Sequence, residues 1–360
     1  MVGIQQLSLV QFRNYVQKQF NFTDRIVGIV GPNGTGKTNV LDALYYLSFT
    51  KSYFSRPDAQ NVHHAYQGLR IQGQYKINEE DIEVTCIIRE NLKKEFYYDT
   101  EMYAKHSQHI GKIPCVMIAP DDVQIITGSS EERRRLVDSL LSQMHPEYLK
   151  YLIQYNKILV QRNSLLKLAA ETGLIDALLL ETLNEQLVQN GNPIFKFRSE
   201  LMSELLPEVL SLYNHLAGQD DIIHIQYLSL LSNTPFDILL EQSLAKDKIL
   251  QRTNVGIHKD DLVITIQGQP FKQEASQGQR KSLLFSLRLA EWKIIKKYKG
   301  FSPILLMDDI FEKLDEQRMI HLLDWVSNAT DGQVFITDTH KERVADLLGK
   351  HLTSYQLIEI

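Results

Sequence analysis

One stretch constrains the fold of this chain more than any other, the ten residues GPNGTGKTNV at 31–40. It follows the apolar run RIVGIV and precedes the helix-compatible segment LDALYYL, so the pattern predicts a buried strand, a glycine-rich loop and a helix. The loop fits G-x-x-x-x-G-K-[ST], the phosphate-binding loop of nucleoside triphosphatases, in the strand–loop–helix context that this motif requires. A chance glycine loop is the alternative, and the agreement of motif with context disfavours it.

The residue types of this loop suit phosphate binding. Its glycines let the backbone turn tightly and point N–H groups at phosphate oxygens, and the start of the following helix adds partial positive charge. Lys37 is expected to reach the β- and γ-phosphates, and Thr38 to offer its hydroxyl to Mg²⁺. The predicted nucleotide-binding residues of the loop are Gly31, Pro32, Asn33, Gly34, Thr35, Gly36, Lys37 and Thr38.

Chain length, net charge and composition limit the classes of protein to which this sequence can belong. A chain of 360 residues exceeds the usual size of one hydrophobic core, so two domains or lobes are expected. The formal net charge of −5 argues against a purely electrostatic nucleic-acid binder, so contact with DNA or RNA requires a local basic patch. The two cysteines lack metal-ligand spacing. The sequence shows no signal-peptide core and no apolar run of about 18 residues. These observations together predict a cytoplasmic protein without a membrane segment.

Two aspartates end the apolar, strand-like run in PILLMDDIF at 303–311. Carboxylates at the carboxyl end of a strand can reach the Mg²⁺ of a phosphate-binding loop. Asp308 is therefore assigned to the metal, and Asp309 to orienting or activating the attacking water. An acidic turn after a buried strand is the alternative.

The segment ASQGQRKSLLFSLRLAEW at 275–292 permits two interpretations. Ser276 is well placed to cap an amphipathic helix, so a capped helix after a glycine turn explains the sequence. Alternatively, Ser-Gln-Gly-Gln resembles the signature motif of ABC-type ATPases. In that case Ser276, Gly278 and Gln279 would engage the γ-phosphate that a second subunit holds.

Three single residues extend the resemblance to ABC-type ATPases. Asp315 resembles the aspartate that contacts the opposing subunit, and His340 lies where these enzymes carry a catalytic switch histidine. Gln124, after IAPDDV, is a candidate for their glutamine loop. For His340 the alternative is an ordinary surface or helix-start histidine.

The order of these motifs is that of an ABC ATPase head, and their spacing separates the subclasses. Ser276 lies 240 positions after Gly36. A transporter subunit has a much shorter insert between these two motifs. An SMC-type head has hundreds of coiled-coil residues there, which this chain lacks.

Secondary-structure periodicity divides the chain into two lobes. Strand-like and helical segments mix in 1–120 and 252–360, whereas helical periodicity dominates 121–251. We therefore expect an α/β fold, an ABC-type P-loop ATPase head that is discontinuous in sequence, with a mainly helical inserted lobe. The predicted breaks among the helices are Gly173, Gly191 and Pro193.

Nearly the whole chain resembles the RecF family of bacterial recombination and repair proteins. The matching segments, besides the loop and SQGQ, are LSLVQFRNY (7–15), ALYYLSFTKSYFSR (43–56), VMIAPDDVQIITGSSEERRRLVD (116–138), GIHKDDL (256–262) and LLMDDIFEKLD (305–315). The resemblance implies an ATP-dependent, DNA-binding protein of replication, repair and the SOS response that acts at single-strand gaps and duplex DNA with recombination mediator proteins. ITDTHKE departs from the threonine-rich stretch of this family, which leaves the role of His340 open.

Candidate DNA contacts come from two basic runs. Residues 280–299 contain seven Lys or Arg against one acid, and Arg133, Arg134 and Arg135 follow two glutamates. A solvated helix face is the alternative for the first run, and ion pairs within the helical lobe are the alternative for the second. Sequence-tolerant contacts to the phosphate backbone are expected.

Three functions remain open at this point. The first is a slow, DNA-stimulated ATPase that dimerises head to tail around two ATP molecules, binds DNA and releases it on hydrolysis. In the second, ATP mainly holds an interface in a scaffolding module with little hydrolysis. The third, a transporter ATPase subunit, is disfavoured by the long helical insert.

Overall fold

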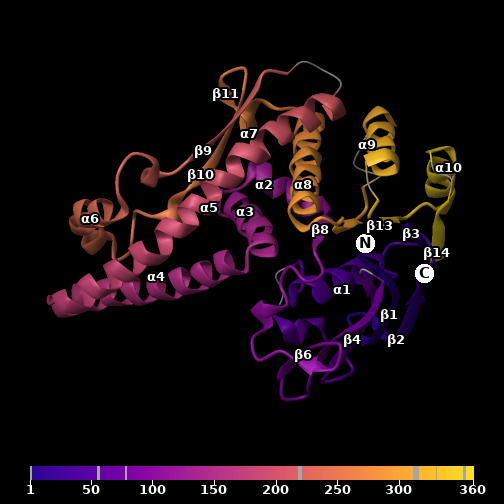
Figure 1. Ribbon diagram of the computed structural model, residues 1–360, viewed down its shortest axis with the longest axis horizontal. Coiled ribbons are helices and arrows are strands. Elements are labelled where there is room, and N and C mark those ends of the chain that lie inside the picture. The colour runs from indigo at the N-terminus through magenta and orange to yellow at the C-terminus, as the bar shows by residue number, and fades with distance from the viewer. Residues whose placement is uncertain are drawn as a thin grey trace. The chain divides into compact units, whose positions relative to one another are not determined.

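The structure, a computed structural model, describes residues 2–54, 57–77, 79–217, 221–310, 316–329, 331–351 and 354–360. The chain divides into two compact units. The first contains residues 1–123, 211–219 and 277–360, and the second contains residues 124–210 and 220–276. The first unit thus combines the indigo start and the yellow end of the chain in Figure 1.

A five-stranded parallel sheet carries the phosphate-binding loop in the first unit. Its strand order is β14-β3-β13-β12-β8, and every neighbouring pair is parallel. Four of the strands are buried at every residue, which explains their near-continuous apolar sequences. The strands are β3 (Ile26–Val30), β8 (Cys115–Ile118), β12 (Ile304–Met307), β13 (Val334–Asp338) and β14 (Gln356–Glu359).

A six-stranded antiparallel sheet belongs to the same unit, in the order β2-β1-β4-β5-β6-β7. Its strands are β1 (Val2–Phe12), β2 (Tyr15–Asn21), β4 (Leu69–Ile77), β5 (Glu80–Ile88), β6 (Lys94–Tyr98) and β7 (Glu101–Met102). The helix after the loop, α1 (Lys37–Phe49), contacts strands of both sheets and buries eleven of its thirteen residues. Because α1 is held in the core, the loop at its start has a fixed position.

Three α-helices of the first unit follow the second unit in the sequence. They are α8 (Gln277–Lys299), α9 (Glu316–Ala329) and α10 (Lys341–His351). Trp292 of α8 donates a 2.9 Å hydrogen bond from its indole to the main-chain oxygen of Pro303, next to β12. This contact holds the helix that follows SQGQ against the strand that leads to the aspartate pair.

Helices dominate the second unit, and the two longest run antiparallel to each other (Figure 1). Arg162 bonds to Asn184, and Arg198 bonds to Tyr148, so α4 contacts α5 at two levels. Among the described residues, none of the helices is both long and apolar enough to cross a membrane. The helices are α2 (Gln124–Thr127), α3 (Ser130–Met144), α4 (Pro146–Thr172), α5 (Ala177–Ala217), α6 (Phe236–Leu250) and α7 (Phe271–Glu274).

Of the three residues predicted to break the helices, Gly173 is confirmed, and Gly191 and Pro193 are wrong. Gly173 ends α4 in a left-handed conformation, with φ of 73°. Gly191 and Pro193, in contrast, lie inside the continuous helix α5. A Cβ on Gly191 would come within 2.7 Å of Phe236, so this glycine permits close packing on α6 and does not end the helix.

The two units differ from the expected lobes in three segments: 121–123 and 211–219 group with the first unit, and 252–276 with the second. Residues 252–276 were expected in the head lobe, but they group with the second unit. The reason is strand pairing, because β10 (Asp261–Ile266) lies antiparallel between β9 (Ile223–Leu228) and β11 (Gln269–Pro270). These residues therefore belong to the sheet of the helical unit.

Candidate functional site

The phosphate-binding loop lies at the carboxyl edge of the parallel sheet. It joins the end of β3 to the start of α1, and the neighbouring strands β13 and β12 run in the same direction as β3. The carboxyl ends of parallel strands meet at one edge, so the loop, the aspartate pair after β12 and the end of β13 lie together. Open α/β sheets bind ligands at this edge.

Gly36 is closely confined by residues of the turn between β1 and β2. Its φ is +113°, a conformation that favours glycine, and a Cβ there would lie 2.6–2.7 Å from the side chains of Asn14 and Tyr15. Asn14 Nδ2 donates to the main-chain oxygen of Thr35 at 2.7 Å, and Asn14 Oδ1 accepts from Asn39 Nδ2 at 2.8 Å. Asn14 therefore ties the loop to the first turn of α1.

Lys37 is the first residue of α1 and has only 7% of its surface exposed. Its Nζ donates to the main-chain oxygens of Gly31 and Pro32, at 2.7 and 2.8 Å. Two neutral carbonyl groups accept from the ammonium, which has three donors, and they do not cancel its charge. The loop thus contains a buried positive charge, as binding of a phosphate chain requires.

Asp308 is buried directly after β12, opposite Thr38. Thr38 Oγ1 lies 2.9 and 3.0 Å from the two carboxylate oxygens, and Thr337 Oγ1 donates to Oδ1 at 2.7 Å. Burial raises the pKa of Asp308, and the hydrogen bonds from the two hydroxyls oppose this shift only in part. Oxygen atoms of this kind are the ligands that Mg²⁺ prefers in proteins.

Asp309 has the left-handed φ of +49°, which is uncommon for a residue other than glycine. Its N–H donates a 2.9 Å hydrogen bond to Thr337 Oγ1, and the same hydroxyl donates to Asp308. Thr337 thus fixes both aspartates to β13. Sparsely populated backbone conformations of this type are concentrated at functional sites.

The residues at this edge fit a nucleoside triphosphate with a divalent cation. The loop offers a buried ammonium and the N-terminal end of a long helix to phosphates. Thr38 and Asp308 offer oxygens to a metal. Among the described residues, no three or more His, Cys, Asp or Glu form a ready-made metal cluster, and Mg²⁺ bound here would share its coordination with the phosphates, as is usual in nucleotide sites.

The predicted signature residues lie at the start of α8. Ser276 is exposed and directly precedes the helix, and Gly278 and Gln279 belong to its first turn. A Cβ on Gly278 would come within 2.8 Å of the Arg318 guanidinium, so this turn packs closely on α9. The arrangement suits both interpretations, a capped helix start and a contact for a second subunit.

Three further predicted residues remain, His340, Gln124 and Asp315. His340 is exposed after β13, and its N–H donates to Asp338 at 2.7 Å. Gln124 is the first residue of α2. Asp315 lies outside the described residues. The switch, glutamine-loop and subunit-contact roles of these three residues stay predictions.

The basic run of α8 includes a buried arginine. Arg288 donates to Glu291 at 2.9 Å and to the Tyr53 hydroxyl at 2.6 Å, and it pairs with Asp122 at 3.1 Å. Burial lowers the pKa of an arginine, but the surrounding acids more than compensate, so Arg288 stays charged. This side chain holds α8 in the core and is not available to DNA.

The three arginines of the second basic run have partners within the second unit. Arg133 pairs with Asp261 at 2.7 Å, and Arg135 pairs with the two glutamates before the run. Arg134 donates to the main-chain oxygen of Asp260 at 2.7 Å. The alternative of internal ion pairs is therefore confirmed for Arg133 and Arg135, whereas Arg134 bonds to a neutral group.

Two residues of the sheet edge were not predicted, Asn14 and Thr337. Asn14 contacts a residue 21 positions away, and Thr337 contacts one 29 positions away. The one sequence signal for Asn14 is that its segment, LSLVQFRNY, resembles a segment of the family. The one signal for Thr337 is that its segment, ITDTHKE, departs from the family pattern. Neither side chain belongs to a spacing motif, so its role emerges only when the strands are assembled.

Comparison with known proteins covers the chain at full length. A family model, the RecF/RecN/SMC N terminal domain, matches residues 3–356. The DNA replication and repair protein RecF of Flavobacterium johnsoniae is 39% identical over 357 residues, with 99% of each chain covered. The protein of the same name from Cytophaga hutchinsonii is 38% identical over 340 residues, with 94% of this chain and 90% of that protein covered.

Solved structures agree with this match. A structure of the recombination mediator protein RecF-ATPrS in the RecFOR pathway has a TM-score of 0.89 and 26% identity, covering 100% of this chain and 96% of that chain. An Smc head domain from Pyrococcus furiosus has a TM-score of 0.57 and 15% identity, covering 99% and 93%, which concerns the fold alone. The predicted fold, an ABC-type ATPase head with a mainly helical inserted lobe, is confirmed. A family-model match over nearly all residues, together with relatives of one name along the full length, makes this chain a member of the RecF family of DNA replication and repair proteins.

Proposed function

We propose that this chain is an ATP-dependent DNA-binding protein of recombinational repair and replication restart. ATP drives head-to-tail dimerisation and DNA binding at single-strand gaps and duplex junctions, and slow hydrolysis releases the DNA. The observation that carries the proposal is the sheet edge where Lys37, Thr38 and the Asp308–Asp309 pair come together. The relatives named for DNA replication and repair, and the neighbour RecF-ATPrS, support it.

Each residue of the edge has a proposed task in nucleotide binding and hydrolysis. When bound, MgATP supplies the phosphoanhydride that is hydrolysed. Lys37 binds the phosphates, and Thr38 and Asp308 hold Mg²⁺. Asp309 orients the attacking water and accepts its proton, and its short side chain suits a slow switch better than a fast motor.

The dimer proposal concerns the remaining predicted residues. Ser276, Gly278, Gln279 and Asp315 of one chain would contact the nucleotide held by the loop of the other chain. His340 would then respond to the γ-phosphate at the same interface. Recombination mediator proteins are the proposed partners of the DNA-bound dimer.

Sizing the protein by light scattering tests this function. The wild type is measured with ATP, with ADP and without nucleotide, each with and without gapped duplex DNA. A dimer that requires ATP and binds DNA more tightly than the monomer is expected. A monomer under all conditions, or an equal DNA affinity in all nucleotide states, would contradict the proposal.

The Ser276→Arg variant separates the two interpretations of SQGQ. A bulky cation at this exposed position should leave ATP binding by the monomer unchanged, because in the head-to-tail proposal Ser276 contributes only to the nucleotide site of the other chain. Dimerisation and hydrolysis should fail together. If the variant dimerises and hydrolyses ATP normally, residues 276–279 are only the start of a capped helix.

A further inference from the structure

Four cations of the second unit lie near one another although they come from separate segments. The first three are Arg134 on α3, Lys246 on α6 and Arg252 after the end of α6, and the fourth is Lys259. Partial burial lowers the pKa of Lys259, and the positive charges of Arg252, Arg134 and Lys246 lower it further. Arg134 donates to the main-chain oxygen of Asp260, the residue after Lys259, and the Arg252 N–H donates to the main-chain oxygen of Asp247, the residue after Lys246, so hydrogen bonds bring these segments together.

The exposed charge of the stretch 246–259 is entirely positive. Lys246, Arg252 and Lys259 are exposed, as is a further lysine at 248, and the one acid of the stretch is Asp247. Asp247 is completely buried and pairs with the equally buried Arg162 at 2.8 Å. The protein therefore concentrates positive charge here, although its formal net charge is −5.

The other acids beside these cations are bonded to different arginines. Asp260 pairs with the buried Arg198 at 2.8 Å, and Asp261 pairs with Arg133 at 2.7 Å. Within the described part of the chain, no carboxylate forms an ion pair with Lys246, Arg252 or Lys259. These three side chains are left to solvent or to a ligand.

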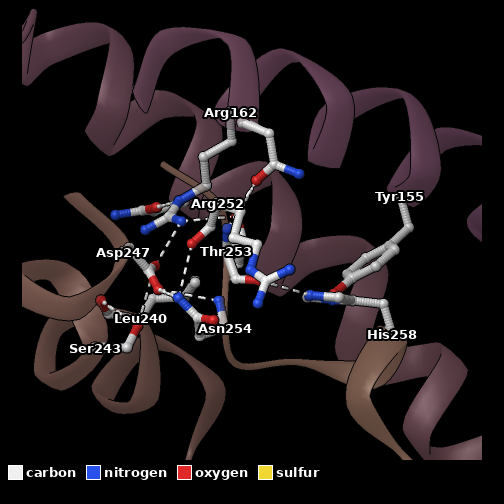
Figure 2. Close-up of polar contacts among 11 residues, drawn as sticks. Tyr155, Arg162, Leu240, Ser243, Asp247, Arg252, Thr253, Asn254 and His258 are labelled. Atoms are coloured by element: carbon white, nitrogen blue, oxygen red, sulfur yellow. Dashed lines mark hydrogen bonds and ion pairs between the residues drawn. The ribbon is translucent and has the colours of Figure 1, made fainter. Parts of the chain in front are cut away.

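A buried polar network holds the loop that carries Arg252 (Figure 2). Arg162 of α4 donates to Asp247 Oδ2 and to Thr253 Oγ1, both at 2.8 Å. Asp247 Oδ1 accepts from the N–H of Asn254 at 2.9 Å, and Asn163 Oδ1 accepts from both the N–H and the hydroxyl of Thr253 at 2.8 Å. The main chain of the loop is thus bonded to α4 and to the end of α6.

His258, which precedes Lys259 in the sequence, extends the same network (Figure 2). Its Nε2 lies 3.1 Å from the main-chain oxygen of Thr253, and its Nδ1 lies 2.8 Å from the Tyr155 hydroxyl. A carbonyl can only accept, so Nε2 carries the proton and Nδ1 accepts from the tyrosine. Burial lowers the pKa of His258 to about 4, so the imidazole is neutral near pH 7 and the network needs no change of protonation.

Gly256 adds a steric constraint on the loop. Its φ is +116°, and a Cβ would lie 2.5 Å from the Tyr155 hydroxyl and 2.7 Å from Phe236. The loop between α6 and β10 therefore has one well-determined path. Because the main chain that carries Arg252 and Lys259 is already ordered, binding of a ligand costs less conformational entropy.

We propose that Arg134, Lys246, Arg252 and Lys259, the basic surface, bind the phosphate backbone of duplex DNA. Clustered cations accumulate counteranions, and phosphates that replace these ions gain the free energy of their release. Lysine and arginine side chains that bind phosphates recognise charge and not base edges, so the contact tolerates any sequence. This inference rests on the proposed DNA binding and assigns part of it to the second unit.

Fluorescence anisotropy with a labelled gapped duplex tests the basic surface. The triple variant K246A/R252A/K259A removes three exposed charges and leaves Arg134, which bonds to the main chain, in place. Its DNA affinity should fall roughly 100-fold near physiological salt, and the slope of log affinity against log salt should become shallower by about 3, since each phosphate contact contributes about 0.9. The control K150A/K157A/K167A removes the same number of exposed charges from α4 and should bind as the wild type does.

Each outcome of this experiment decides a separate claim. A triple variant that binds DNA as the wild type does, or a control that loses as much affinity, would overturn the basic surface. Displacement of the duplex by polyglutamate as efficiently as by unlabelled duplex would overturn its assignment to DNA. If the wild type itself binds no DNA in the presence of ATP, the proposed function fails. If only the triple variant loses DNA affinity, while its ATP binding and its unfolding stay normal, both the proposed function and the basic surface are supported.

Discussion

Two buried aspartates, one in each unit, differ in the groups that surround their carboxylates. Asp247 in the second unit pairs with a buried arginine and also accepts hydrogen bonds from Asn254 and Ser243. The bonds to the Asp308 carboxylate in the described structure come from the hydroxyls of Thr38 and Thr337. The Asp247 carboxylate is thus paired with a cation of the protein itself, whereas the Asp308 carboxylate is buried and accepts from neutral hydroxyl groups.

This difference separates a structural site from a binding site. A buried ion pair whose carboxylate accepts further hydrogen bonds holds helices and loops in one arrangement. A buried carboxylate bonded to hydroxyls has a raised pKa and gains most from an added cation, which an ATP-bound Mg²⁺ would provide. The fold of the second unit depends on the first kind of site, and the proposed switch depends on the second kind.

The largest expected effect is on folding, from Asp247→Ala. The change leaves the Arg162 charge buried without a partner, so the free energy of unfolding should fall by about 3–5 kcal/mol, as measured by urea denaturation. The double variant R162M/D247L should recover most of this loss because both charges are removed. Glu241→Ala, an exposed acid on α6, is the control and should change little. A loss below about 1 kcal/mol for Asp247→Ala would show that the pair is not structural.

Asp309→Asn should affect turnover and not binding. An amide cannot accept the proton of the attacking water, so the rate of hydrolysis should fall by about 100-fold or more, while ATP and Mg²⁺ still bind. The variant should accumulate as an ATP-bound dimer, measured by single-turnover hydrolysis and by sizing. Hydrolysis at the wild-type rate would assign the role to another residue.

The smallest expected effect is a pH-dependent gain in stability from Asp308→Asn. The raised pKa means that the folded state binds this proton more tightly than the unfolded state. The ionised carboxylate therefore destabilises the nucleotide-free protein at neutral pH, and this penalty disappears as the pH falls below the unfolded value of about 4. The variant should be more stable than the wild type at pH 7, with the gain fading towards pH 4, in denaturation curves measured without nucleotide. Reduced stability at pH 7 would contradict the comparison with Asp247.

The strands and helices of the nucleotide edge could be predicted because their signals are local. The loop motif occupies eight consecutive residues, and the aspartate pair directly follows an apolar run. The positions of Asn14 and Thr337 could not be predicted, because each acts on a residue from another element of the sheet. Gly191 was misjudged because a glycine that permits close packing and one that ends a helix look the same in a sequence.

The basic surface shows the same limit more clearly. Charge counting favoured 280–299, but Arg288 from that run is buried against acids. Arg134 and Lys259 are 125 positions apart and are brought together by the fold. Local charge density in a sequence therefore says little about charge density on a folded surface.

Titration of ATP into the Lys37→Ala variant tests the central claim most directly, that the edge of the parallel sheet is the nucleotide site. The wild type, the variant and the exposed control Lys157→Ala are compared by calorimetry in the presence of Mg²⁺. Loss of the buried ammonium should abolish ATP binding or weaken it by more than about 100-fold, because charged hydrogen bonds of this type contribute several kcal/mol when water is excluded. The control should bind as the wild type does. A Lys37→Ala variant with near-wild-type ATP affinity would contradict the account.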